Sequence, residues 1–286
     1  MSNTKIIFNQ YKIYVLLTWL CFLPSSMHAQ QSADSLSGLS YDALITKCRQ
    51  AHNQDLKEFY LLEVLERAKL EKDMRYLSRG YHLGALITEN ETRLNYCDSL
   101  IILTRDRSNT YYPAAAYILR GNSAYRRNDF KSALDDYLEA NRYAKTHANV
   151  EYTMESNYYI GLLKDKVGEH AEALKLHKDN YNSLKRDPSI VSDSDYLTYM
   201  FALANSYNEL QQLDSASYYN RLGVLESRRL QKPTKYYHFV LNEGITQHYN
   251  KRYLVSLDSI HKALDYLKTQ NDEQNCAIGY FYAGRS

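Results

Sequence analysis

Histidine, cysteine and carboxylate side chains are the residues of this sequence that could do chemistry, and their spacing matches no catalytic pattern. The nine histidines include no H-E-x-x-H motif, and His238 and His248 are expected at the surface or in a groove rather than on zinc. Adjacent Asp135 and Asp136 point in different directions on a helix, as on a solvated face. The sequence has no G-x-S-x-G motif, no glycine-rich phosphate loop and no Cys/His nucleophile signature. We therefore predict a protein that is not an enzyme, with no catalytic residue, no metal and no cofactor.

The cysteines form no framework either. Beyond the first 29 residues they are Cys48, Cys97 and Cys276, an odd number at wide spacings. Isolated buried thiols fit this pattern better than disulfides or a zinc site.

The first 29 residues have the three-part layout of a secretory signal peptide. Lys5 and Lys12 form a basic start, an apolar run of 11 residues covers 13–23, and Ala29 ends a short exit. The apolar run is too short to span a bilayer comfortably. We predict export with cleavage after Ala29, into the periplasm or onto a membrane facing it. Retention as an uncleaved anchor stays open, because Met27 stands where a small residue is usual.

Charge argues against a nucleic-acid footprint in this segment. The leader has two lysines and no acidic residue, so the rest of the chain carries 33 basic and 33 acidic residues and no net charge. A surface that binds the phosphate backbone needs a basic excess or a long basic run, and neither is present.

Internal repeats in the sequence indicate which elements position these side chains. A small residue is followed by another small residue after twelve positions in four places: Gly121 and Ala133, Gly161 and Ala173, Ala204 and Ala216, Gly244 and Ser256. Small residues at this spacing let two antiparallel helices approach closely. Turn-compatible residues separate the two expected helices at 128–129, 168–169, 212–214 and 250–251. The pattern predicts stacked helical hairpins.

This pattern resembles the tetratricopeptide repeat (TPR). The match is good at Tyr117, Gly121, Ala133 and Tyr137, although the usual leading Trp is missing and the spacing is 40 to 43 rather than 34. The resemblance implies an all-α, TPR-like alpha-solenoid of antiparallel helix hairpins wound into a right-handed superhelix. We expect a signal peptide at 1–29, a helical lead-in at 30–75 and four to five repeats at 76–286. The last repeat is incomplete, which suggests that the chain continues.

The order of leader, lead-in and repeats also resembles the exported sensor region of Bacteroidetes-type transcriptional regulators. That resemblance implies a protein or peptide ligand, and a membrane tether through a C-terminal part missing here. The alternative is a stand-alone periplasmic TPR scaffold for protein assembly. A cytoplasmic peptide-responsive regulator would require residues 1–29 to stay on a cytosolic protein.

A bound peptide would lie along the first helix of each pair, which lines the concave surface of such superhelices. From the register of the repeats, the inward-facing candidates are Ile118, Asn122, Tyr125, Arg126, Tyr158, Leu162, Asp165, Thr198, Phe201, Asn205, Asn208, His238, Leu241 and His248.

Two of these candidates match a family position. Related repeats often use an Asn at the position of Asn122 and Asn205 to bond a peptide backbone, but the Lys of the carboxylate clamp is replaced by Ile118 and Phe201. An apolar or aromatic peptide is therefore expected rather than a terminal carboxylate. The alternatives are that the aromatic residues pack in the core and that the two asparagines cap or cross-link helices.

Overall fold

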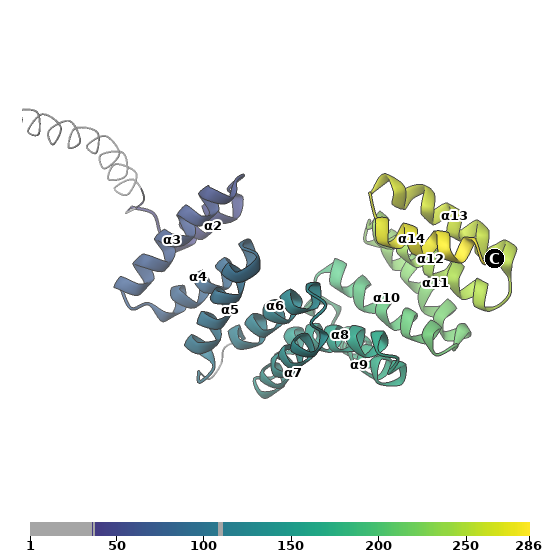
Figure 1. Cartoon of the computed structure of the whole chain (residues 1–286), viewed down its shortest axis with the longest axis horizontal. Helices are drawn as coiled ribbons and strands as arrows, with labels where there is room; N and C mark the ends of the chain where they lie inside the picture. The colour runs from purple at the N-terminus through teal and green to yellow at the C-terminus, as the bar shows by residue number, and fades with distance from the viewer. Residues whose placement is uncertain (1–35, 37, 108–110) are drawn as a thin grey trace, which may run out of the picture. The chain divides into compact units, whose positions relative to one another are not determined.

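A computed structural model describes residues 36, 38–107 and 111–286, and these residues form helices and short turns without a β-strand (Figure 1). The predicted all-α fold class is confirmed. The predicted signal peptide at 1–29 lies outside the described residues. Among the helices that are described, none combines the length and the apolar character needed to cross a membrane.

Consecutive helices pair as antiparallel hairpins, each with a first and a second helix. The pairs are α2 (Tyr41–Gln50) with α3 (Gln54–Leu70), α4 (Met74–Ile87) with α5 (Asn90–Thr104), α6 (Tyr112–Arg126) with α7 (Phe130–Thr146), α8 (Val150–Lys166) with α9 (His170–Arg186), α10 (Asp193–Glu209) with α11 (Leu213–Arg229), and α12 (Pro233–Tyr249) with α13 (Tyr253–Thr269). A short 3-10 turn, η1 (Pro188–Ile190), precedes α10, and α14 (Glu273–Ala283) follows α13.

One turn geometry recurs between the helices. In the turn after α6, Asn128 has a φ of 61°, and the Asp129 amide donates to the Ala124 carbonyl at 3.0 Å. This arrangement is a Schellman motif, which ends a helix with one left-handed residue. The same left-handed position is taken by Lys72, Asn128, Ala148, Gly168, Gln211, Gln231, Lys251 and Asn271. The predicted turns are therefore observed, except that Leu213 and Asp214 already lie in α11.

Glycines in the first helices make room for large side chains of the second helices. A Cβ atom on Gly121 would lie 2.7 Å from the Tyr137 ring, and one on Gly161 would lie 2.5 Å from the His177 ring. Real Cβ atoms do not approach other atoms this closely, so these positions require glycine. The predicted small-residue spacing thus reflects close packing, but the side chain that fills the space lies sixteen residues after the glycine rather than twelve.

Buried asparagines cross-link helices both within one hairpin and between neighbouring hairpins. Asn141 donates to the Asn157 side-chain oxygen at 2.8 Å, and Asn157 donates to that of Asn180 at 3.1 Å. Further along, Asn208 donates to Asn242 and Asn242 donates to Asn220, each at 3.0 Å. Because each buried amide is satisfied, these networks favour one register of the helices over others.

The contacts divide the chain into two compact units, 1–96 and 97–286. In the first unit, the Arg67 guanidinium donates to the carbonyls of Leu39, at 2.6 Å, and Leu36, at 3.0 Å. The second unit contains the four glycine- and alanine-based hairpins from which the repeat was predicted. Cys48, Cys97 and Cys276 are buried, as predicted.

Candidate functional site

First helices of successive hairpins contact each other throughout the second unit: α6 with α8, α8 with α10, α10 with α12, and α12 with α14. In a curved array, neighbouring helices come closest on the inner side. The first helices therefore carry the inner surface of this unit, which is where the sequence places a ligand.

Three of the predicted ligand contacts are core residues instead. Ile118 is 2% exposed and packs with Ala114, Ala140 and Ala144. Asn208 is 1% exposed and belongs to the asparagine network, and Leu241 is also buried. These positions were wrong as ligand contacts, because the first helices are packed on more than one side and an average register cannot separate an inner from a core position.

Asn122, Asp165 and His248 are only partly buried, but their polar atoms are engaged. The Tyr137 hydroxyl donates to the Asn122 side-chain oxygen at 2.7 Å. Asp165 accepts from the Ser206 hydroxyl, and its other oxygen lies 3.1 Å from the His170 ring nitrogen. Burial raises the pKa of Asp165, and these two contacts oppose the rise.

His248 has a structural setting as well. Its Nδ1 atom lies 2.7 Å from the Ser286 hydroxyl, and its ring packs edge-on against Tyr249, Tyr253 and Tyr282. These contacts fix the imidazole ring and leave little of its surface for a ligand.

Eight further predicted residues keep side-chain surface: Tyr125, Arg126, Tyr158, Leu162, Thr198, Phe201, Asn205 and His238. Arg126 is exposed, and Asn205 has no hydrogen bond from its side chain to any described residue. The structure thus separates the asparagine pair: Asn122 serves the fold, whereas Asn205 has its amide free for a ligand.

Tyr158 lies in a pocket between two first helices, α8 and α10. This pocket has a volume of about 260 Å³ and is named here the acidic pocket. Its walls are Glu151, Glu155, Tyr158, Tyr159, Val191, Asp195, Thr198 and Tyr199. Tyr158 and Thr198 were predicted to face inward, and the structure brings them together. The carboxylates and the other two tyrosines were not predicted.

Three carboxyl groups and no cationic side chain line the acidic pocket. Burial, then the charges of Asp195 and Glu151, raise the pKa of Glu155 to about 7. Glu155 has no hydrogen-bond partner among the described residues, so its charge is uncompensated when it ionises. A cationic group placed beside it would relieve that repulsion and lower the pKa.

The tyrosines shape the acidic pocket and stay neutral. Burial raises the pKa of Tyr158 to about 12 and also raises that of Tyr199. The rings of these two residues pack 5.5 Å apart, centroid to centroid. Aromatic faces beside carboxylates provide cation–π and ionic contacts to the same ligand group.

The nearest lysine lies at the edge of this surface. The Lys235 ammonium, from α12, donates to the Thr198 hydroxyl at 2.7 Å. Burial lowers the pKa of Lys235, and the Asp195 charge opposes that shift. The cation is therefore close to Thr198 but does not form an ion pair with a wall carboxylate.

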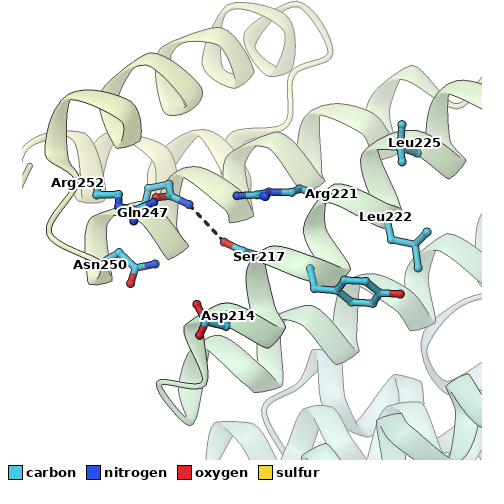
Figure 2. A pocket seen from close by; sticks show the side chains of 9 residues that line it. Asp214, Ser217, Arg221, Leu222, Leu225, Gln247, Asn250 and Arg252 are labelled. Carbon is cyan, nitrogen blue, oxygen red and sulfur yellow. Dashed lines mark hydrogen bonds between the residues drawn. The ribbon is translucent and has the colours of Figure 1, made fainter.

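A second hollow, of about 340 Å³, lies beside the second helix α11. Figure 2 shows its side chains, among them Asp214 and Arg221 on α11 and Arg252 beyond α12. The Gln247 amide donates to the Ser217 hydroxyl at 3.3 Å, the dashed line in Figure 2. Charges of both signs line this hollow, and Arg221 is mostly exposed, so the acidic pocket is the better defined site.

No cluster of three or more histidine, cysteine or carboxylate residues suited to hold a metal occurs in the ranges that the structure describes.

Comparisons with known proteins bear on the fold. No protein-family model and no curated protein sequence matches the chain. Among solved structures, BtubC from P. vanneervenii aligns with a TM-score of 0.64 and 11% identity, over 82% of this chain and 93% of that one. The apo form of RapI aligns with a TM-score of 0.64 and 14% identity, over 86% and 97%. These matches confirm the predicted TPR-like solenoid, and at such identities they establish the fold alone.

Proposed function

We propose that this chain is a peptide- or protein-binding scaffold that acts without catalysis, and that its acidic pocket takes a basic side chain of the ligand. The observation that carries the proposal is the largely buried Glu155 carboxyl, which lacks a partner and lies among tyrosine rings on the inner helices. A lysine or arginine side chain supplies the missing charge, and its methylene stem packs on the rings.

The remaining inner surface suits the residues that flank this basic side chain. Phe201 offers a partly exposed ring, and Asn205 offers a free amide one turn further along α10. A side-chain amide can bond both groups of an extended peptide backbone. The ligand that fits is therefore an extended segment with a basic residue and an apolar or aromatic neighbour.

Peptide arrays provide the test. A set of five-residue peptides that differ only at the central position is measured at about pH 8 against the chain and against Glu155→Gln. Lysine and arginine peptides are expected to bind at least about tenfold more tightly than the norleucine peptide, as for a partly buried ion pair. Asp179→Asn, which removes an exposed carboxylate outside the pocket, is the matched control. Equal affinity for all peptides, whatever their central residue, would contradict the proposal.

We further propose that the scaffold is exported and forms the extracytoplasmic sensor part of a longer regulator. The leader-like residues 1–29 support the export of the chain. Sequencing the gene past the codon for Ser286 tests it: an in-frame membrane helix followed by a helix-turn-helix domain would support the sensor. A stop codon at that point would favour the alternative, a stand-alone periplasmic scaffold. Finding intact residues 1–29 on a cytosolic protein would contradict both.

A further inference from the structure

A third pocket of the 97–286 unit has a charge opposite to that of the acidic pocket. It has a volume of about 520 Å³ and lies where the end of α11, the start of α12 and the middle of α13 meet. It is named here the basic pocket. Its walls are Ser227, Arg228, Gln231, Lys232, Pro233, Tyr236, Tyr237 and Lys262. None of these side chains belongs to the inner surface discussed above.

Three cationic side chains line the basic pocket, and no carboxylate does. Arg228, Lys232 and Lys262 form no ion pair with any aspartate or glutamate of the described chain. The neighbouring Arg229, by contrast, forms an ion pair with Glu226. The uncompensated charges repel one another, and an anion would remove that repulsion.

The same positive charges act on the pKa of Tyr236. Burial alone would raise the pKa of Tyr236, but the hydrogen bond from Arg228 and the charge of Lys262 outweigh burial, so the pKa is lowered. The Arg228 guanidinium donates to the Tyr236 hydroxyl at 3.0 Å and lies 4.9 Å from the ring centroid. Arg228 is thereby oriented at the pocket wall before any ligand arrives.

An independent feature of the pocket is a buried hydroxyl without a partner. Ser227 is 1% exposed, and its Oγ atom makes no hydrogen bond within the described chain. Leaving such a group unpaired costs about 1–3 kcal/mol.

We propose that the basic pocket binds an oxyanion, a phosphate or carboxylate group carried on an aromatic or apolar body. The three cations supply the charge, the Ser227 hydroxyl supplies a neutral donor, and the rings of Tyr236 and Tyr237 pack against the body. The site is independent of the acidic pocket, so a ligand could occupy both only as a molecule with separated charges of opposite sign.

Calorimetric titration of the whole chain with phenyl phosphate, inorganic phosphate and benzoate tests this inference. Saturable binding of phenyl phosphate is expected, at least about tenfold weaker in Arg228→Gln and in Lys262→Gln, because each loses a charge-assisted hydrogen bond. Lys251→Gln is the matched control, since Gln211 and Gln231 already occupy the equivalent turn position. It removes one positive charge outside the pocket and should leave binding unchanged.

The three probes distinguish the two sources of the anion. Tighter binding of phenyl phosphate than of benzoate identifies a phosphate group, and the reverse order identifies a carboxylate. Weaker binding of inorganic phosphate than of phenyl phosphate supports the aromatic body. The inference is overturned if no probe binds saturably, or if both pocket variants bind as tightly as the unaltered chain while circular dichroism shows them folded.

Discussion

The acidic and basic pockets are built on one repeated helix plan, yet they carry opposite charge. The acidic pocket lies between two first helices and has three carboxyl groups, whereas the basic pocket lies at the joint of α11, α12 and α13 and has three cations. The glycines, rings and asparagines that hold the helices together lie beneath both. The difference shows that the buried residues determine the helix scaffold. A few residues that line the pockets then determine which ligand charge each pocket accepts.

Reversal of charge at the centre of the acidic pocket should have the largest effect. In Glu155→Lys, affinity for a lysine-containing peptide should fall by at least about 100-fold, or about 2.7 kcal/mol, because attraction is replaced by repulsion. Isothermal titration calorimetry measures the change. Phenyl phosphate affinity at the basic pocket should stay unchanged in the same protein, and its loss would show that the lysine had disturbed the fold instead. Glu155→Gln gives a milder change that keeps the size of the side chain.

The asparagine pair separates scaffold from ligand surface. Asn122→Ala should lower the free energy of unfolding by about 1–3 kcal/mol, because the buried Tyr137 hydroxyl loses its acceptor. Asn205→Ala should change it by less than about 0.5 kcal/mol, as expected of a side chain with no partner to lose. Urea denaturation measures both. Equal destabilisation by the two substitutions would contradict the assignment of Asn122 to the fold.

Binding at the acidic pocket should depend on pH. Because the pKa of Glu155 is raised to about 7, its carboxyl is mostly neutral at about pH 6 and mostly charged at about pH 8. Affinity for a lysine peptide should therefore rise with pH, by up to about tenfold over that range. Glu151, Asp195 and Lys235 also face this region. Glu155→Gln should remove the dependence, and a dependence that survives would assign it to another group.

The smallest effect is expected at the edge of the acidic pocket. Lys235→Met removes the cation that donates to Thr198. Affinity for a lysine peptide should then increase by about twofold to threefold, since one repulsive charge is lost across a partly solvated gap. Lys251→Met, which removes a charge elsewhere, serves as the control in the same titration. A decrease in affinity would mean that Lys235 contacts the ligand.

The hairpins were predictable because close helix packing leaves a mark in the sequence. Gly121, Gly161, Ala204 and Gly244 stand 40 to 43 residues apart, and the turns need a left-handed residue at a fixed place. Gly168 was an evident turn residue, but Ala148 and Gln211 take the same conformation without any such signal. The turns they form could be placed only from the repeat itself.

The acidic pocket could not be predicted with the same reasoning. Equivalent positions of α8 and α10 are 43 residues apart, which aligns Glu155 with Thr198, and both line the pocket. Asp195 lies about one helical turn earlier than Thr198 and lines the same pocket. Crossing geometry depends on side-chain packing and is not encoded in the spacing. The same limit explains why Ile118 and Asn208 were placed on the inner surface although they are buried.

The most direct test of the account is a comparison of two five-residue peptides with tyrosines on either side of a central residue, one with lysine and one with glutamate. Their dissociation constants are measured for the unaltered chain and for Glu155→Lys at about pH 8. The account predicts that the unaltered chain prefers the lysine peptide by at least about 100-fold and that Glu155→Lys reverses the preference. The same preference in both proteins, or none in either, would contradict the proposal that the acidic pocket recognises a basic side chain.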